Sequence, residues 1–354
     1  MLSTSRLAIR RKLLRWYERN KRDLPWRRTR DPYAIWIAET MLQQTQVKTV
    51  IPYYEKFLAT FPTVSDLAGA PRQKVLRHWS GLGYYRRAEN LRKAATQIVR
   101  RHGGELPREP DRLRALAGVG DYTAGALLSI AFDRPYPAID GNVRRVLSRL
   151  CRLKTERQLR RTAATLVPKK NPGTFNQALM ELGATLCAPK NPRCPTCPLR
   201  SQCATALLPP AATTARNKSR RRVIDIVWPL AIVRRGGKIL LRRRDAKGLL
   251  AGLWELPGGE LLERESTAAA LARHLPSLGV SLAHAKKIGV VHHAITYRRI
   301  RAPVFLFGAC TNCDIVLPGS RWRWVPFNKL AERATSSMTA KAASLVSAYE
   351  KTLL

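Results

Sequence analysis

Four cysteines lie close together in the stretch "CAPKNPRCPTCPLRSQC". Cys187, Cys194, Cys197 and Cys203 follow the spacing C-x6-C-x2-C-x5-C, and thiolates this close in sequence are typical metal ligands. Zinc sites usually combine two Cys-x2-Cys pairs or add histidines, but this stretch has one such pair and no histidine nearby. Iron–sulfur clusters take four cysteinates with looser spacing. We therefore expect an iron–sulfur cluster, with zinc as the alternative.

The other cysteines give no sign of disulfides. The chain has seven cysteines, an odd number, which argues against a disulfide framework and for a reducing compartment. We expect Cys151, Cys310 and Cys313 to be ordinary thiols. No stretch of eighteen apolar residues is present, so we expect no membrane span and a cytoplasmic protein.

Glu39 is the first carboxylate whose surroundings indicate chemistry. It lies in "YAIWIAETMLQQTQV", where helical spacing places Ile35, Trp36, Leu42 and Gln43 around it, with no cation at i+4. A carboxyl beside apolar side chains has a raised pKa, which suits a general acid near neutral pH. The alternative is an exposed glutamate on an amphipathic helix.

The stretch "LAGVGDYTAGALLSIAF" places Gly118 and Gly120 on either side of Val119, directly before an expected helix. The glycines allow a tight turn whose amide groups could face a phosphate oxygen. The alternative is a plain helix-start turn with Asp121 as the N-cap.

Asp140, in "AIDGNVRRVLSRL", is the second candidate carboxylate. The same residues also fit a purely structural role, in which Asp140 and Gly141 form a turn and Asn142 caps the next helix. Both roles can hold at once. Because Glu39 and Asp140 are far apart in sequence, only the fold can bring them together.

The formal net charge of +40, from 64 Lys and Arg against 24 Asp and Glu, indicates a polyanionic partner. Nucleic acid is the first candidate, because cations that neutralise phosphates release condensed counterions. The alternative is a charged surface that serves only solubility.

Two domains joined by a linker are expected. Residues 1–206 read as helical segments separated by Pro and Gly, and residues 207–223 form a basic linker rich in Pro, Ala and Thr. The N-terminal stretch is Arg-rich, but we interpret it as an amphipathic helix rather than a transit peptide. The apolar residues that indicate this helix are Leu7, Ile9, Leu13, Leu14 and Tyr17.

Residues 224–354 have the pattern of an α+β domain. Arg-Gly-Gly joins β-branched runs in "VIDIVWPLAIVRRGGKILLRRRD", which predicts a hairpin. A helix is expected over Thr267–Leu275, and another ends the chain. Further strand candidates are "VVHHAITYRRIRAPVFLFGAC" and "RWRWVPF".

Together these features resemble the MutY-type adenine DNA glycosylases of the endonuclease III-like, helix-hairpin-helix superfamily. The resemblance covers nearly the whole chain and is closest in the N-terminal two-thirds. It implies a mostly helical glycosylase domain, with a six-helix barrel and a 4Fe–4S cluster on the four clustered cysteines, followed by an α+β Nudix-like domain. The stretches that carry it are "RDLPWR", "DPYAIWIAETMLQQTQV", "FPTVSDLAGA" and "GLGYYRRAENLRKAA".

The resemblance implies a reaction and a division of labour. Adenine mispaired with 8-oxoguanine or guanine in double-stranded DNA is flipped out, and a monomeric enzyme hydrolyses its N-glycosidic bond during base excision repair. Glu39 matches the glutamate that protonates the adenine ring and then helps to activate water. Asp140 matches the aspartate that stabilises positive charge on the sugar, and Asn142 a residue that orients water or that aspartate.

The resemblance also implies DNA contacts. Gln44 and Tyr84 match residues that fill the gap in the base stack; their alternative roles are a polar helix face and a core aromatic. The hairpin Gly118–Gly120 would contact the DNA backbone, and Arg86 and Arg87 follow Tyr84 in a place suited to phosphates.

Two positions predict a monofunctional enzyme. Tyr122 stands where bifunctional relatives carry a lysine that forms a Schiff base and cuts the strand, and we expect it to lie by the sugar and Asp140. Arg144 stands where some relatives carry a lysine that can trap the abasic product.

The stretch "GLLAGLWELPGGELLERESTAAALARHLPSLGV" resembles the Nudix box of pyrophosphohydrolases. A working box needs acids that hold Mg²⁺, but Arg273 is followed by His274, and Ser277 and Leu278 stand where acids belong. The register is also one residue short. We expect no metal-dependent hydrolysis here, and MutY-type enzymes carry degenerate Nudix-like domains that recognise the 8-oxoguanine strand.

The recognition loop of the family typically reads Phe-Ser/Thr-His, and the matching stretch here is Ile295-Thr296-Tyr297. Thr296 keeps a hydroxyl that could bond the oxidised base, whereas Ile295 and Tyr297 change its neighbours. We assign 8-oxoguanine recognition to Thr296 and Tyr297; the alternative is a simple strand end.

Two other functions compete with adenine excision. A bifunctional pyrimidine glycosylase/lyase would need a lysine where Tyr122 stands. A catalytically silent DNA-binding protein with a metal-bound module would have no reason to keep both Glu39 and Asp140.

Overall fold

The computed structural model describes residues 3–206, 223–246, 248–275, 285–307, 317 and 319–351. Contacts divide the chain into two units: residues 1–70 with 89–217, and residues 71–88 with 218–354. Of the predicted linker, only Val223 is described, and Cys310 and Cys313 lie outside the described residues. Within the described ranges, no helix has the length and apolar character needed to cross a bilayer.

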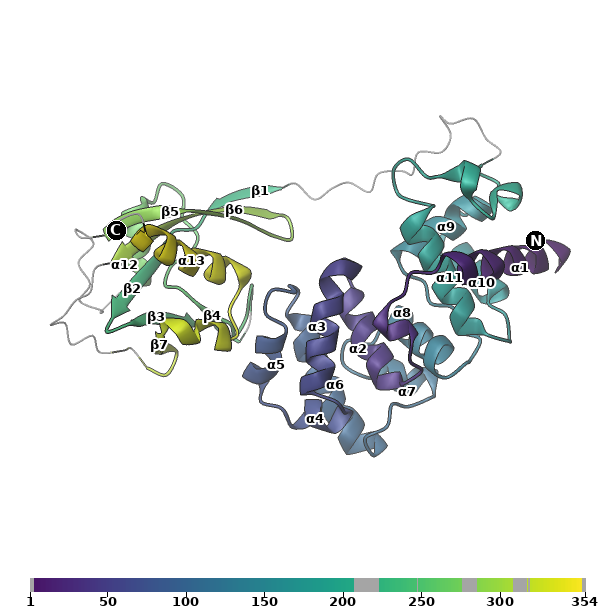
Figure 1. The fold of residues 1–354 in the computed structure, drawn as a ribbon, viewed down its shortest axis with the longest axis horizontal. Helices are drawn as coiled ribbons and strands as arrows, with labels where there is room; N and C mark the ends of the chain where they lie inside the picture. Colours follow the sequence, from purple (N-terminus) through teal and green to yellow (C-terminus); the bar gives the residue numbers. More distant parts are fainter. Residues whose placement is uncertain are drawn as a thin grey trace. The chain divides into compact units, whose positions relative to one another are not determined.

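The first unit is built from helices (Figure 1), as the Pro- and Gly-punctuated pattern predicts. Short helical turns connect several of them, including a π-helical turn after α8 (Leu127–Ala131). The helices are α1 (Ser3–Asn20), α2 (Pro32–Leu42), α3 (Val47–Thr60), α4 (Val64–Gly69), most of α6 (Arg86–His102), α7 (Pro110–Arg114), α8 (Asp121–Ala126), α9 (Gly141–Cys151), α10 (Glu156–Leu166) and α11 (Pro172–Thr185).

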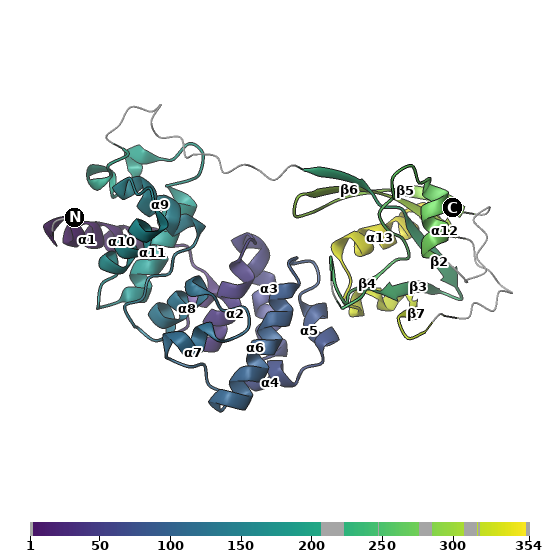
Figure 2. The ribbon, with the colours of Figure 1, turned by 180° about the vertical axis from the view of Figure 1, so that it is seen from behind.

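Helices from the two ends of this unit share one core. Figures 1 and 2 both show α1 beside α9, α10 and α11, and α1 and α9 each pack on α11. Ile9, Leu13 and Tyr17 of α1 are buried in this core, so the predicted amphipathic helix is confirmed. Leu7 is 62% exposed, because it lies off the face that the i, i+4 series from Ile9 defines.

Two N-caps expected from the sequence are wrong. Asp140, not Asn142, caps α9, and its carboxylate accepts from the amide of Val143. Gly120 is the N-cap residue of α8 and makes no side-chain cap bond, while Asp121 is its first helical residue. The carboxylate of Asp121 is instead paired with Arg114 and Arg160.

The second unit contains the strands and helices expected for the C-terminal part. Strands β1 and β2 pair parallel with successive stretches of β6, residues 298–301 and 304–307, and β5 pairs antiparallel along β6. Strand β3 pairs antiparallel with β2, β4 and β7. The strands are β1 (Ile224–Val227), β2 (Leu230–Arg235), β3 (Lys238–Arg243), β4 (Trp254–Glu255), β5 (Ala285–Ile295), β6 (Arg298–Phe307) and β7 (Trp322–Pro326).

Two helices cover opposite faces of this sheet. Alternate residues of β2 point to different cores: Ile232 packs with residues of α13 (Ser337–Lys351), and Val233 packs with residues of α12 (Thr267–His274). The predicted Arg-Gly-Gly hairpin joins β2 to β3, and Gly236 and Gly237 both have positive φ there. Two successive positive φ angles are what a tight two-residue hairpin turn requires.

The segment that includes α5 (Arg72–His78) groups with the second unit. The Nε2 atom of Gln73 donates to the carbonyl oxygen of Gly252 at 2.9 Å. The hydroxyl of Tyr85 donates to the carbonyl oxygen of Thr335 at 3.2 Å. Side-chain to backbone hydrogen bonds therefore join this early segment to the C-terminal residues.

Candidate active site

Glu39 projects from a helix that is buried along almost its whole length. Asp31 is the N-cap of helix α2, and its carboxylate accepts from the amides of Tyr33 (3.0 Å) and Ala34 (3.2 Å). Pro32 occupies the first helical position. From Tyr33 to Met41 every residue is buried, and Glu39 is 5% exposed. The alternative of an exposed glutamate is therefore wrong.

The buried carboxyl of Glu39 has one polar partner in the described structure, the hydroxyl of Tyr122, which donates to Oε2. Burial raises the pKa of Glu39 to about 7; the bond from Tyr122 opposes this rise, and the charge of Asp140 adds to it. The raised pKa expected from the apolar neighbours is confirmed. Near neutral pH, a large fraction of this carboxyl therefore carries a proton.

Tyr122 lines the same cavity as Asp140, as expected, and its hydroxyl donates to Glu39. The reason is the packing of α8 against α2, which faces the phenol toward the Glu39 carboxyl. Burial, followed by the charges of Glu39 and Asp140, raises the pKa of Tyr122 well above its ordinary value. The phenol stays neutral and remains a hydrogen-bond donor.

Asp140 sits at the start of α9, where helix geometry favours an anion. Its Oδ1 accepts from the amide of Val143 (2.6 Å) and its Oδ2 from Nδ2 of Asn142 (2.9 Å). Burial raises its pKa, and these two bonds and the nearby Arg145 act in the opposite direction. Among the described residues, Asp140 therefore has two donors and a nearby cation that favour its ionised form, whereas Glu39 has one donor, the hydroxyl of Tyr122.

Asn142 is itself held from two sides. The Nη2 atom of Arg145 donates to its Oδ1 at 2.7 Å. Gly183 of α11 passes so close that an added Cβ would lie 2.6 Å from Cβ of Asn142. A side chain at position 183 would displace Asn142, so the close approach of α11 helps to fix the Asp140–Asn142 pair.

Glu39 and Asp140 line one cavity, of about 560 Å³, in the helical unit. It lies where α2 and α8 face the start of α9 and the middle of α11. Apolar side chains and the side-chain amides of Asn and Gln form part of its wall, and charged side chains form much of the rest. The lining includes Trp26, Arg27, Gln43, Gln44, Tyr122, Asn142, Arg144, Gln177 and Glu181.

One charged group in this cavity was missed by the sequence reasoning. Glu181 is 1% exposed, and its carboxylate accepts from Arg22 (2.6 and 2.9 Å) and from Arg27 (2.7 Å). Burial alone would raise the pKa of Glu181, but the bonds from the two arginines outweigh it and lower the pKa. The available signal was the pair of arginines at the two ends of "RDLPWR", Arg22 and Arg27.

The two residues expected to fill the DNA stack share an unusual backbone conformation. Gln44 and Tyr84 have φ values of 60° and 48°, in the left-handed region that residues other than glycine seldom adopt. Gln44 lines the cavity. Tyr84 is 43% exposed, so the core-aromatic alternative is wrong, and the guanidinium of Arg87 lies 5.4 Å from its ring. Arg86 is exposed at the start of α6.

The glycine hairpin is tightly packed on one side and open on the other. Gly118 has a φ of 78°, and an added Cβ would lie 2.7 Å from Cβ of Asn90, whereas Gly120 has open space. The amide of Val119 donates to the carbonyl oxygen of Leu116 at 3.1 Å, so this amide is already engaged.

Arg144 is held by an acid next to the cavity. Its guanidinium forms an ion pair with Glu156. Glu156 also pairs with Arg160, which pairs with Asp121. This chain of charges links α8, α9 and α10.

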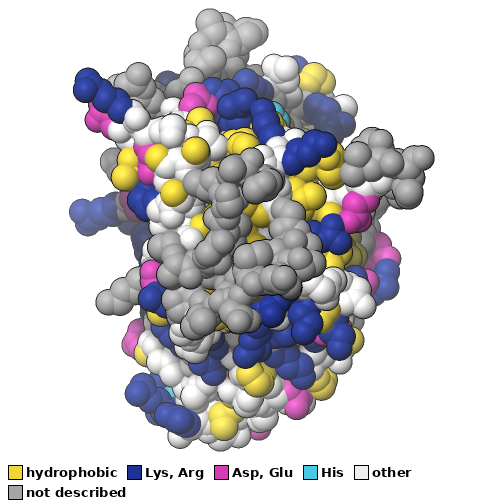
Figure 3. Space-filling view, turned by 90° about the vertical axis from the view of Figure 1, so that its left-hand side faces the viewer, with side chains coloured by type: hydrophobic (Ala, Val, Ile, Leu, Met, Phe, Trp, Pro, Cys, Tyr) yellow, Lys and Arg dark blue, Asp and Glu magenta, His cyan; other side chains and the backbone are white. Residues whose placement is uncertain are grey.

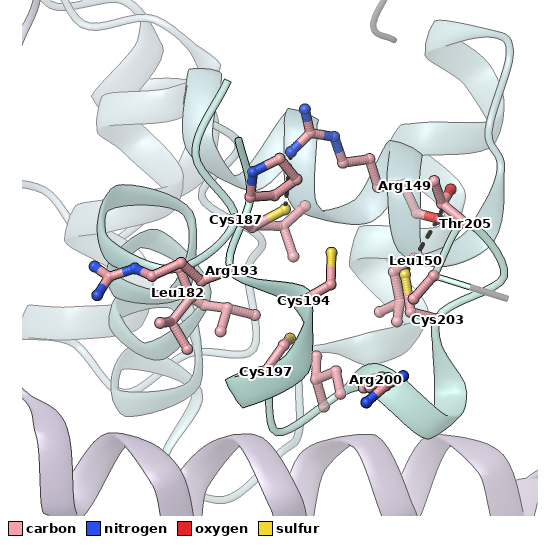
Figure 4. A pocket seen from close by; sticks show the side chains of 15 residues that line it. Arg149, Leu150, Leu182, Cys187, Arg193, Cys194, Cys197, Arg200, Cys203 and Thr205 are labelled. Atoms are coloured by element: carbon pink, nitrogen blue, oxygen red, sulfur yellow. Dashed lines mark hydrogen bonds between the residues drawn. The ribbon is translucent and has the colours of Figure 1, made fainter. Parts of the chain in front are cut away.

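The four clustered cysteines line one cavity of about 330 Å³, near the ends of α9 and α11 (Figure 4). The Nη1 atom of Arg149 donates to Sγ of Cys187 at 3.4 Å. Within the described parts of the chain, no three His, Cys, Asp or Glu side chains are arranged to hold a metal ion. The four-thiol donor set nevertheless fits an iron–sulfur cluster in its chemistry.

The predicted recognition residues lie at the turn between β5 and β6. Thr296 is exposed with a φ of 58°, and its hydroxyl donates to the carbonyl oxygen of Ile295 at 2.7 Å. The guanidinium of Arg298 lies 4.7 Å from the ring of Tyr297. In the degenerate Nudix box, Arg273 pairs with Glu265, while Ser277 and Leu278 lie outside the described residues.

Comparisons with known proteins identify the family of this chain. A model described as "HhH-GPD superfamily base excision DNA repair protein" matches residues 37–169, and a NUDIX domain model matches residues 229–345. The adenine DNA glycosylase of Homo sapiens is 36% identical to this chain, over 89% of this chain and 70% of that protein. The chain belongs to the adenine DNA glycosylase family.

Solved structures agree on the helical part. A thermostable thymine-DNA glycosylase is 31% identical with a TM-score of 0.55, covering 57% of this chain and 97% of that chain. A non-covalent complex of endonuclease III with DNA is 26% identical with a TM-score of 0.50, covering 58% and 97%. The expected fold class, a helical glycosylase domain followed by a Nudix-like domain, is confirmed.

The pKa of Glu39 predicts how stability depends on pH. The folded chain binds the Glu39 proton with a pKa of about 7, against 4.5 for the ordinary group. This contribution to the free energy of unfolding is present in full below pH 4.5 and is lost as pH rises through 7, by about 3 kcal/mol in total. We expect Glu39→Gln to remove this loss, so that the variant exceeds the parent in stability at about pH 8.

Urea denaturation of both proteins between about pH 5 and pH 8 measures the difference. The exposed Glu105, replaced by Gln, is the control and should follow the parent. Parallel curves for the Glu39 variant and the parent would contradict the assignment of a buried, protonated carboxyl.

Proposed function

We propose that this DNA glycosylase removes adenine paired with 8-oxoguanine or guanine in double-stranded DNA, and that it lacks lyase activity. The observation that carries the proposal is the single cavity lined by Glu39 and Asp140, which come from separate helices. One carboxyl has a pKa near 7, and the other has donors that favour its ionised form. Glycoside hydrolysis uses two carboxyls that differ in protonation, and the different surroundings of Glu39 and Asp140 support that division.

The geometry supports specific roles for three side chains. The hydroxyl of Tyr122 donates a hydrogen bond to Oε2 of Glu39, so the proton available for transfer can be bound to Oε1. Glu39 gives this proton to the adenine ring, the bond between C1′ and N9 breaks, and the base leaves as neutral adenine. Asp140, held by Val143 and Asn142, stabilises the positive charge on the sugar.

Water completes the reaction. Its oxygen bonds to C1′, and its proton returns to the Glu39 carboxylate, which restores the acid for the next cycle. Among the residues that the structure describes, the cavity lining offers no lysine for a Schiff base, and the phenol of Tyr122 cannot form one. This supports hydrolysis without strand cleavage.

The charge distribution supports DNA as the partner. The net charge is +40, and Lys and Arg side chains gather in several places on the face in Figure 3. We propose that Gln44 and Tyr84 fill the space left by the flipped base, since their left-handed backbones hold them at exposed turns. Arg86 and the Gly118–Gly120 hairpin are then contacts to the DNA backbone.

The hydroxyl of Thr296 supports recognition of the oxidised base. Because its hydrogen is donated to Ile295, the oxygen offers only lone pairs to a partner. 8-Oxoguanine carries a hydrogen on N7, whereas N7 of guanine is an acceptor. A hydroxyl fixed as an acceptor therefore prefers 8-oxoguanine, and the ring of Tyr297, backed by Arg298, can pack against it.

We further propose that Cys187, Cys194, Cys197 and Cys203 hold a 4Fe–4S cluster, on the basis of their shared cavity and their spacing. The bound cluster would fix the shape of this loop. The cysteine content supports a reducing compartment, which we propose to be the cytoplasm, where the protein acts as a monomer.

Excision assays test the reaction. The protein is incubated with duplexes that contain A:8-oxoguanine, A:G or A:T, and abasic sites are then revealed by alkali. We expect Glu39→Gln to lower the single-turnover rate by about 10²- to 10⁴-fold, the usual contribution of a general acid, with duplex affinity within a few-fold. Near-normal excision by this variant would overturn the assignment of Glu39.

The control Glu105→Gln should match the parent in the same assay. Trapping of a protein–DNA adduct by borohydride in the parent would instead favour a bifunctional lyase. Absence of alkali-labile product from the parent on every duplex would favour a silent DNA-binding protein.

Thr296→Ala should reduce the preference for A:8-oxoguanine over A:G by about 5- to 10-fold, since one hydrogen bond contributes about 1 kcal/mol. The ratio of single-turnover rates on the two duplexes is the measurement. Thr296→Ser keeps the hydroxyl and is the matched control. Equal ratios for the alanine variant and the parent would assign recognition to other residues.

The cofactor is tested without any activity measurement. Protein purified without oxygen should show broad visible absorption and about four irons per chain. Cys194→Ser should lose both signals, whereas Cys151→Ser should keep them. Colourless protein with stoichiometric zinc would contradict the cluster.

A further inference from the structure

Helix α1 carries a row of cations that the active site does not use. Arg11, Arg15 and Arg19 are spaced at i, i+4 and i+8, and all three are exposed. They lie on the side of α1 away from Ile9 and Leu13, which are buried. Because α-helices rise 1.5 Å per residue, the Cα atoms of successive arginines in this row lie about 6 Å apart along the helix axis.

Among the described residues, no acid forms an ion pair with this row. Glu18 is the one acid in α1, and it pairs with Lys21 at 2.7 Å. Like charges at i, i+4 weaken a helix, so the row opposes the stability of α1. A polyanion that binds across the row would relieve this repulsion.

The arginines border a cavity of about 340 Å³. Trp16, half-buried against the helical core, and Pro198 of the cysteine loop contribute its apolar surface. Lys12 donates to the hydroxyl of Ser201 at 2.8 Å, which fixes the helix against that loop. We call this cavity the basic groove. Its residues do not line the active-site cavity.

We propose that this basic groove binds the phosphate backbone of a second segment of double-stranded DNA while the active site engages the first. Evenly spaced guanidinium groups suit the repeating phosphates of a duplex, and each can make two parallel hydrogen bonds. The apolar surface of Trp16 and Pro198 accommodates the sugar edges between phosphates. An acidic peptide helix would need several apolar pockets, and the groove offers one.

Two DNA-binding faces allow the protein to pass directly from one segment to another. Such transfer does not need the first segment to dissociate fully, because a doubly bound intermediate forms. The inference goes beyond the proposed reaction, since it concerns undamaged DNA and involves no base recognition.

Competitor-dependent dissociation tests the proposal with the full chain. The complex with a labelled, undamaged duplex is mixed with increasing unlabelled duplex, and release of the label is followed by anisotropy. In the parent, the release rate should rise with competitor concentration. In the triple variant Arg11→Gln/Arg15→Gln/Arg19→Gln, the slope of the release rate against competitor concentration should fall at least 5-fold. In Arg15→Gln alone, the slope of log affinity for the second duplex against log salt concentration should become smaller by about one.

Matched variants separate the groove from total charge. Lys93→Gln/Arg100→Gln/Arg101→Gln removes the same charge from exposed positions of α6 and should behave as the parent. Replacing the three arginines of α1 with lysine should preserve transfer. The triple glutamine variant should also retain the parent's single-turnover excision rate, which shows that it is folded.

Three outcomes would overturn the proposal. One is unchanged competitor dependence in the triple glutamine variant, and another is an equal loss in the α6 control. Polyglutamate serves as a probe for acidic proteins. The third outcome is a triple glutamine variant that no longer binds polyglutamate but still transfers between DNA segments, which would assign the groove to an acidic protein. Because the duplexes are undamaged, failure here is independent of failure in the excision assays.

Discussion

Burial of the Glu39 carboxyl is the constraint on which the candidate active site depends. Removing this group from water raises its pKa to about 7, and the Tyr122 hydroxyl satisfies one of its oxygens. Both effects require α8 to pack on α2. The same packing forms one wall of the cavity, so proton affinity and cavity shape have a common origin in the helical core.

Much of the fold could be predicted because local signals agreed with tertiary packing. The i, i+4 series Ile9, Leu13 and Tyr17 marks the buried face of α1. Paired glycines after Arg235 predict the hairpin between β2 and β3, since both adopt positive φ. The raised pKa of Glu39 could be predicted because the apolar residues around it belong to its own helix.

The remaining site features depend on contacts between distant segments. Glu181 gave no signal in isolation, because its partners Arg22 and Arg27 are far away in sequence. The hydroxyl of Tyr122 could have reached either carboxylate, and helix packing decides between them. The N-caps of α8 and α9 were misassigned because neighbouring Asp, Gly and Asn residues all cap helices well, and only the backbone angles distinguish them.

The cap that Asp140 provides for α9 has a consequence for how this position can vary. A single carboxylate secures the first turn of a helix through Oδ1 and binds Asn142 through Oδ2. Shortening or enlarging the side chain would thus disturb architecture and reactivity together. Only an isosteric amide would separate them, by keeping an oxygen for the turn while discarding the negative charge.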